Sequence, residues 1–130
     1  MKEIKVVCGI IYHNNKIFIA RRKEGKDFSG KWEFPGGKVE NEESEKEALC
    51  RELLEELGMK VIVGKKIGFS KHQYETFSIE LIAYNCKFVS ATFVMTDHDQ
   101  YRWVEHKSLH EFDFTDADIP LIDLINRFSE

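Results

Sequence analysis

Residues 37–59, GKVENEESEKEALCRELLEELGM, form the most acidic stretch of this 130-residue chain. The stretch contains eight Glu and no Asp, and six of these Glu fall between positions 40 and 52. Such a run forms either a solvated helix face or a set of carboxylates that binds a metal ion. The spacing of the acids bears on this choice.

The stretch predicts a helix that begins after Ser44 and ends near Gly58. Ser44 and Glu47 have the spacing of a capping box, and glycine suits the left-handed residue that ends many helices. Residues three or four apart share one face of a helix. On this helix the buried face is predicted to carry Leu49, Leu53 and Leu57.

Three acids, Glu52, Glu55 and Glu56, share a different face. Like charges at this spacing destabilise a helix by roughly 0.2–0.5 kcal/mol per pair. Acids near the C-terminal end also oppose the helix dipole. Clustered carboxylates are hard ligands that suit Mg²⁺ or Mn²⁺. Spacing alone leaves both the metal site and the solvated face open.

The wider pattern resembles the Nudix box, Gly-x5-Glu-x7-Arg-Glu-U-x-Glu-Glu-x-Gly-U, where U is a bulky aliphatic residue. All nine fixed positions match: Gly37, Glu43, Arg51, Glu52, Leu53, Glu55, Glu56, Gly58 and Met59. Residues 8–22 (CGIIYHNNKIFIARR), 30–40 (GKWEFPGGKVE) and 117–125 (ADIPLIDLI) look like the MutT branch of nucleoside triphosphate pyrophosphohydrolases. The resemblance is thin between about residues 60 and 97.

The resemblance implies one domain over residues 1–130 with an α+β fold, an α/β/α sandwich in which helices flank a mixed β-sheet. Hydrophobic periodicity indicates the same order of elements. Strands are predicted at residues 4–12, 16–22, 60–73, 76–89 and 101–106, with the first two forming a hairpin. Residues 23–32 are predicted to be a loop and 33–38 a rigid turn, and further helices are predicted at 107–112 and 118–128.

The resemblance also implies a metal site and a catalytic set. Its metal ligands are Glu52, Glu55, Glu56, the carbonyl of Gly36 and Asp97, with Asp99 as a competing choice for the last. The implied cofactor is Mg²⁺, for which Mn²⁺ substitutes. The catalytic residues are Glu52, Glu55 and Arg51, with Glu52 as the candidate base. Arg51 would orient the acids with Glu43 as its partner, although an ordinary surface ion pair is the alternative.

The substrate-binding residues implied by the resemblance are Arg22, Phe28, Phe34, Gly36, Gly37, Lys38, Tyr74, Phe77 and Asp118. Arg22 and Lys38 are candidates for phosphate contacts, and the aromatic residues either stack on a base or pack in the core. Asp118 either binds the base or caps the last helix in a capping box with Thr115. A carboxylate only accepts, so it favours N–H groups of an oxidised guanine or the amine of cytosine. Guanine-type members carry Asn here, which leaves the base open.

Composition excludes other classes of function. A net charge of −4 without a long basic tract argues against binding duplex nucleic acid. No apolar run approaches the roughly 20 residues that a membrane span needs. Three Cys without a Cys-x-x-Cys pair fit a reducing cytosol. We therefore expect a cytoplasmic monomer or homodimer whose partner is a nucleoside triphosphate.

The expected activity is Mg²⁺-dependent hydrolysis of an NTP or dNTP to its monophosphate and pyrophosphate. The expected substrates are 8-oxo-dGTP or a modified CTP or dCTP, which would place the chain in nucleotide-pool sanitation and DNA repair. The alternatives are another nucleoside diphosphate-X substrate, such as a dinucleoside polyphosphate or ADP-ribose, and a non-catalytic nucleotide-binding domain. Non-catalytic members usually lose acids from the box, whereas this chain retains them.

Overall fold

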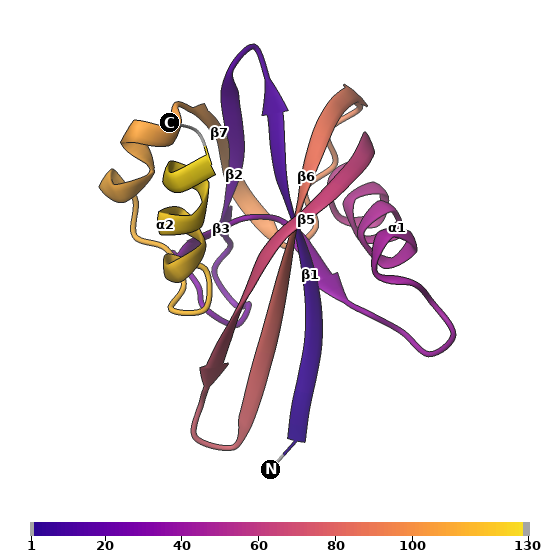
Figure 1. The fold of residues 1–130 in the computed structure, drawn as a ribbon, viewed down its shortest axis with the longest axis vertical. Coiled ribbons are helices and arrows are strands. Elements are labelled where there is room, and N and C mark those ends of the chain that lie inside the picture. The colour runs from indigo at the N-terminus through magenta and orange to yellow at the C-terminus, as the bar shows by residue number, and fades with distance from the viewer. Residues whose placement is uncertain (1, 129–130) are drawn as a thin grey trace.

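A computed structural model describes residues 2–128, in which one mixed β-sheet lies between helices (Figure 1). Its strands are β1 (Lys2–His13), β2 (Lys16–Arg22), β3 (Trp32–Glu33), β4 (Gly36–Lys38), β5 (Met59–Gln73), β6 (Phe77–Ala91) and β7 (His98–Val104). The helices are α1 (Glu45–Leu57), the 3₁₀ helix η1 (His106–Glu111) and α2 (Ile119–Phe128). The predicted mixed sheet with flanking helices is confirmed.

Strands β1 and β6 form the parallel centre of the sheet, which has the order β3-β2-β1-β6-β5. The predicted hairpin of β1 and β2 pairs only near its turn, at Tyr12 with Ile17 and His13 with Lys16. Beyond that point the two strands separate, and the segment between β2 and α1 enters the gap. There β3 pairs with β2, while β4 pairs with β1.

The prediction of a rigid turn at residues 33–38 was therefore incomplete. Glu33 ends β3, and Gly36–Lys38 form a strand against residues 6–8 of β1. Strands of two or three residues are too short to show a period-2 pattern, so no periodic signal in the sequence predicts them. The pairing matters because it holds the glycine backbone at the centre of the molecule.

Both faces of the sheet are buried, as the continuous apolar run in β1 predicts. Val7 and Ile11 face α1 and pack with its leucines. Cys8 and Ile10 alternate with them and pack on the opposite side with residues of η1 and α2. The helices accordingly cover opposite faces of the sheet (Figure 1).

Helix α1 has the predicted ends. Ser44 and Glu47 form a complete capping box, and Gly58 adopts the left-handed conformation with φ of 61°. The predicted final helix begins at Ile119, and β7 begins at His98 rather than Tyr101. Within residues 2–128, none of the helices has the length and apolar character needed to cross a bilayer.

Candidate functional site

An open cleft lies where α1, β4 and the segment before β7 meet. Its acidic side chains include Glu52 and Glu56 on α1, Glu33 on β3 and Asp97 beside β7, and Asp27 and Glu40 from the flanking loops also line it. Arg22, Gly36, Gly37 and Lys38 also line it. The cleft therefore brings together most of the metal-binding and phosphate-binding residues predicted from the sequence.

The two glycines of β4 allow neighbouring groups to approach the backbone more closely than a β-carbon would. A β-carbon at Gly37 would lie 2.7 Å from Cγ of Glu52 and even closer to its carboxyl group. A β-carbon at Gly36 would overlap the carbonyl oxygen of Val7 and lie 2.7 Å from Cα of Cys8. At Gly36 glycine is required for space because the neighbouring atoms are backbone, whereas at Gly37 the neighbour is the Glu52 side chain, which would have to move.

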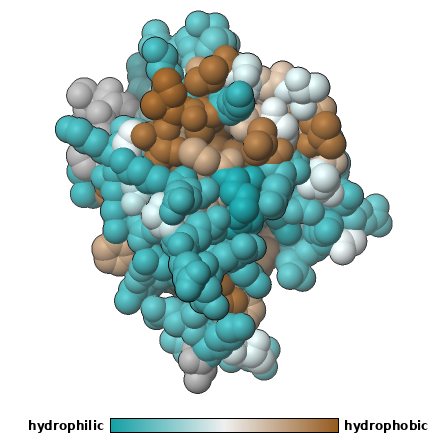
Figure 2. Space-filling model, turned by 90° about the vertical axis from the view of Figure 1, so that its right-hand side faces the viewer, coloured by the Kyte–Doolittle hydropathy of each residue, from teal (hydrophilic) through white to brown (hydrophobic). Residues whose placement is uncertain are grey.

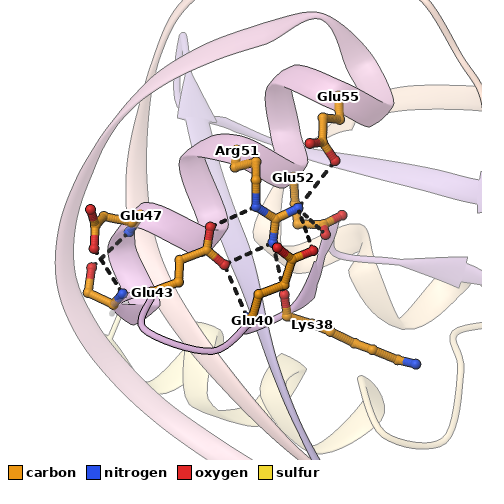
Figure 3. Close-up of polar contacts among 8 residues, drawn as sticks. Lys38, Glu40, Glu43, Glu47, Arg51, Glu52 and Glu55 are labelled. Atoms are coloured by element: carbon orange, nitrogen blue, oxygen red, sulfur yellow. Dashed lines mark hydrogen bonds and ion pairs between the residues drawn. The ribbon is translucent and has the colours of Figure 1, made fainter.

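Arg51 connects the loop before α1 to the acids on the helix (Figure 3). Its Nε and Nη2 donate to the two carboxylate oxygens of Glu43, at 2.7 and 2.9 Å. Nη1 donates to Glu52 at 2.8 Å and to Glu55 at 3.2 Å, and Nη2 also reaches the carbonyl of Lys38 at 3.1 Å. The predicted Arg51–Glu43 pair is present as a bidentate contact inside a larger network.

Glu55 occupies a different position from Glu52 and Glu56. Its side chain is 60% exposed and is held by Arg51, and it is not among the described residues that line the cleft. The predicted ligand Glu55 thus lies at the edge of the site in this structure.

Lys38 lines the cleft, and its ammonium points away from the Arg51 network in Figure 3.

Glu56 is a partly buried acid of the cleft. Burial, a hydrogen bond with Asp97 and the charge of Glu52 raise the pKa of Glu56 to about 9. Its Oε2 atom is buried, and no donor in the described part of the chain reaches it. A buried carboxylate oxygen without a partner is costly, and a cation would relieve that cost.

Asp97 is held beside Glu56 by the segment that follows β6. Backbone N–H groups of Val94 and Thr96 donate to the carbonyls of Leu57 and Glu56, both at 3.4 Å. These are carbonyls that a helix leaves without intrahelical partners at its C-terminus. Burial acts to raise the pKa of Asp97, but the Glu56 hydrogen bond and the Lys26 ammonium, 3.1 Å away, hold it below its usual value.

The competing residue Asp99 faces elsewhere. Its carboxylate accepts from Nε and Nη2 of Arg21, at 2.8 and 3.1 Å, and it does not line the cleft. The pairing of β2 with β7 shifts register between Arg21 and Arg22. Asp97 therefore lies at the cleft, whereas Asp99 belongs to a pair on the exposed side of β2.

A second, smaller hollow adjoins the cleft and shares Val6, Phe28, Glu33 and Gly36 with it. Asp118 lies in its wall and is 5% exposed. Its Oδ2 accepts from the backbone N–H of Phe34 at 2.7 Å, and its Oδ1 accepts from the Thr115 hydroxyl at 2.7 Å.

These bonds differ from the capping box considered for Asp118. In a capping box the Thr115 hydroxyl would accept from a helix N–H, whereas here it donates to the carboxylate. Burial and the nearby charge of Glu33 raise the pKa of Asp118 to about 8. Asp118 therefore ties the start of α2 to the segment between β3 and β4.

The candidate aromatic residues divide into two groups. Phe28 and Tyr74 line the second hollow with ring centroids 5.4 Å apart. Phe34 also lines it and packs against Phe114. Phe77 stacks on Tyr74 at 5.0 Å and is not among the described residues lining either hollow. The structure places Phe28, Phe34 and Tyr74 at the hollow, whereas Phe77 contacts it only through Tyr74.

Sequence reasoning missed several residues of the site, among them Glu33 and His98. Glu33 lines both hollows, and its Oε2 lies 2.7 Å from Nε2 of His98 and 3.4 Å from Nη1 of Arg22. The position of Glu33 immediately before Phe34 was the available signal for it. His98 had no signal, because a buried histidine within a polar run resembles loop content.

Within residues 2–128, no three His, Cys, Asp or Glu side chains are already arranged to enclose an ion.

A surface apolar patch also lies away from the cleft residues. Figure 2 shows it in the upper part of the α1 side, above hydrophilic surface. A shallow groove of α1, β5 and β6 includes Leu54, Met59 and Val89. Its described lining residues include no acid or histidine.

Comparison with known proteins identifies the family. The profile described as "NUDIX domain" matches residues 6–124. The chain is 37% identical over 123 residues to the CTP pyrophosphohydrolase of Escherichia coli K12, covering 95% of this chain and 91% of that protein. It is 33% identical over 132 residues to the 8-oxo-dGTP diphosphatase of Haemophilus influenzae, covering 93% and 90%.

Solved structures agree with these sequence relationships. The solution structure of the E. coli ORF135 protein superposes with a TM-score of 0.87 at 35% identity, covering 99% of this chain and 92% of that one. The MutT protein of methicillin-resistant Staphylococcus aureus 252, a family Nudix hydrolase, gives 0.76 at 37% identity, with coverage of 98% and 99%. With its complete box, its two-sided sheet and these relatives, the chain belongs to the Nudix family.

Proposed function

We propose that this chain hydrolyses nucleoside triphosphates to monophosphates and pyrophosphate with a divalent cation. The observation that carries the proposal is the convergence of Glu52, Glu56 and Asp97 on one cleft beside a hollow walled by Tyr74 and Asp118. An acidic cleft would repel a triphosphate unless a cation reversed its local charge. The names of the relatives support a nucleotide substrate.

The residues of the cleft fit a divalent cation. All their donors are oxygens, which Mg²⁺ prefers, and Oε2 of Glu56 is buried without a partner in the described part of the chain. Glu52, Glu56, Asp97 and the carbonyl of Gly36 would hold the ion, with Glu55 at the edge. When bound, Mg²⁺ or Mn²⁺ supplies neutralisation of phosphate charge, polarisation of phosphoryl oxygens and a lower pKa for a bound water.

The protein's own groups orient the reactants. Arg51 orients Glu52, the candidate general base, by donating a hydrogen bond to one of its carboxylate oxygens. The other oxygen faces the backbone of Gly37. Arg22 and Lys38 line the same cleft and supply positive charge for the phosphates. Their role is to bind the triphosphate chain with its scissile bond beside Glu52.

The hollow around Asp118 supports recognition of a base through donated hydrogens. Its polar side chains include two acids, Glu33 and Asp118, beside the hydroxyl groups of Thr115 and Tyr74, while Phe28 and Tyr74 supply aromatic faces. An exocyclic amine or a ring N–H fits such a site better than a carbonyl edge does. We therefore propose CTP, dCTP or their modified forms, together with 8-oxo-dGTP, as the substrate class.

Removal of such nucleotides is a pool-sanitising function that protects DNA. The three described cysteines, Cys8, Cys50 and Cys86, are all free, which fits a reducing cytosol as the place of action. We also expect the enzyme to be a monomer or a homodimer, and sedimentation would distinguish the two.

The test is a substrate panel. The protein is incubated with Mg²⁺ and CTP, dCTP, 5-methyl-dCTP, 8-oxo-dGTP, ADP-ribose or a dinucleoside polyphosphate, and pyrophosphate and nucleotide products are quantified. We expect pyrophosphate from the triphosphates, its loss in EDTA and its loss in Glu52→Gln. Turnover confined to ADP-ribose or the dinucleotide would favour the nucleoside diphosphate-X alternative, and binding without turnover would favour a non-catalytic domain.

A further inference from the structure

His98 is a buried polar residue that the proposed reaction does not use. Its side chain has no exposed surface, and Nε2 lies 2.7 Å from Oε2 of Glu33. A carboxylate accepts hydrogen bonds, so Nε2 is the nitrogen that carries the donated hydrogen. Nδ1 is also buried and has no partner in the described part of the chain. The imidazole therefore has one polar contact, and it is with Glu33.

Glu33 occupies the boundary between the two halves of the site. Its side chain lines both the acidic cleft and the hollow around Asp118. It makes a second, longer contact of 3.4 Å with Arg22, itself a cleft residue. The next residue, Phe34, donates its backbone N–H to Asp118. Any shift of the Glu33 carboxylate would therefore change both the acidic cleft and the hollow around Asp118.

The backbone explains why His98 faces inward. Arg21 pairs with Gln100 and Arg22 pairs with His98, so Asp99 is an extra residue on β7 at a β-bulge. Bulges next to active sites commonly re-aim a side chain. Here the bulge turns Asp99 out toward Arg21 and turns His98 in toward Glu33. Asp97, beside Glu56, directly precedes His98 in the chain.

We propose that His98 is a positioning residue that fixes Glu33 between the base-binding hollow and the phosphate cleft, and thereby sets substrate preference. The proposal rests on the proposed function, because preference is defined only for an active enzyme. His98 is not among the described residues that line either the cleft or the hollow, so it acts through Glu33. A merely structural His98 would contribute to stability and leave preference unchanged.

A double-mutant cycle of His98→Phe and Glu33→Gln separates these roles. His98→Phe fills the space without a donor, so we expect kcat/KM to fall about 10- to 100-fold, as for a lost hydrogen bond to a charged group. The ratio of kcat/KM for CTP and 8-oxo-dGTP should change as well. In the Glu33→Gln background, His98→Phe should add less than about threefold, because its target is already altered.

Rescue by a conservative variant is the second readout. The amide nitrogen of His98→Gln lies near the position of Nε2, whereas the shorter His98→Asn places its amide near Nδ1. We expect Gln to recover most of the activity and the wild-type substrate ratio, and Asn to resemble Phe. If the Phe variant does not fold, Asn replaces it in the cycle.

Ile125→Val is the control for simple destabilisation, since Ile125 is buried in α2 and absent from the described lining of both hollows. It should lower Tm slightly and leave the substrate ratio unchanged. Additive effects in the cycle, or a Gln variant as impaired as Phe, would overturn the role of His98. A wild-type protein inactive on every triphosphate would instead overturn the proposed function.

Discussion

The carboxyl group of Glu52 lies so close to the backbone of Gly37 that a β-carbon at residue 37 would overlap it. Gly37→Ala should therefore fold but move Glu52, and a misplacement of about 1 Å can cost about 100-fold in rate. Gly36→Ala meets the backbone of Val7 instead, which has no rotamer by which to yield. It should destabilise the protein by about 1–3 kcal/mol or more.

Thermal unfolding followed by circular dichroism and steady-state kinetics on the folded fraction check this pair. The expected contrast is a near-normal Tm with low activity for Gly37→Ala, and a low Tm for Gly36→Ala. A fully active Gly37→Ala protein would mean that Glu52 can move without consequence for catalysis.

The three box acids should differ in importance. Glu52 and Glu56 line the cleft, while Glu55 is mostly exposed and bound to Arg51. Glu52→Gln and Glu56→Gln should each lower kcat by about 10²- to 10⁴-fold, the range for loss of a positioned catalytic group. Glu55→Gln should cost distinctly less. Kinetics at saturating Mg²⁺ measure the order, and a Glu55 variant as impaired as Glu52→Gln would restore Glu55 to the centre of the site.

Much of the fold could be predicted because the chain's strong signals are local. The capping box at Ser44 and the left-handed Gly58 bound α1 where expected. The alternating apolar residues of β1 face two separate cores, as a run buried on both sides implies. Strand β3 and strand β4 were missed because they exist only through pairing with β2 and β1, which are distant in sequence.

Like the fold, the site has parts that follow from local sequence and parts that depend on long-range contacts. The box acids follow from spacing on one helix, and their convergence with Asp97 depends on a backbone segment docked on the end of α1. His98 and Glu33 lie 65 positions apart in sequence. A β-bulge, which has no sequence pattern of its own here, aims His98 inward. Contacts of this kind come from the tertiary fold and not from any local period.

Arg51→Lys should impair catalysis although it preserves charge. The guanidinium engages Glu43 through two nitrogens and Glu52 through a third, whereas an ammonium cannot bridge both carboxylates in that geometry. We expect kcat/KM to fall at least about tenfold, consistent with loss of one charged hydrogen bond. Lys46→Ala, at an exposed position of α1, is the control and should keep normal kinetics. Equal activity of Arg51→Lys would reduce the network to a surface ion pair.

The stability of the metal-free protein should fall as the pH rises. The pKa of Glu56 is raised to about 9 from an ordinary value of 4.5, so the folded state holds a proton that the unfolded state releases. This contribution is fully present below about pH 4.5 and is lost as the pH rises toward about 9. Asp118, with a pKa of about 8, acts in the same direction.

Tm measured in EDTA between about pH 5 and pH 9 tests this linkage. Glu56→Gln, which stays neutral, should flatten part of the slope, and the Asp118 part should remain. Mg²⁺ favours the ionised carboxylate, so its stabilisation of the wild-type protein should grow with pH. Identical slopes for the wild type and Glu56→Gln would show that Glu56 does not carry the proton.

Asp118 is better tested by substitution with asparagine than with alanine. Its carboxylate accepts the backbone N–H of Phe34 and the hydroxyl of Thr115, both buried. Asp118→Ala leaves the Phe34 N–H without an acceptor and should cost about 1–3 kcal/mol. Asp118→Asn can accept from Phe34 with its carbonyl and donate to the Thr115 oxygen with its amide. It should therefore keep near-normal stability at neutral pH.

With its fold intact, Asp118→Asn isolates the chemistry of the base-binding hollow. The amide presents a donor and an acceptor at every pH, whereas the Asp118 carboxyl changes form near its raised pKa of about 8. We expect the ratio of kcat/KM for CTP and 8-oxo-dGTP to vary with pH through that region in the wild type and to be flatter in the Asn variant. Parallel pH profiles, together with an undiminished Tm for Asp118→Ala, would remove Asp118 from both roles, because neither its hydrogen bonds nor its ionisation would then matter.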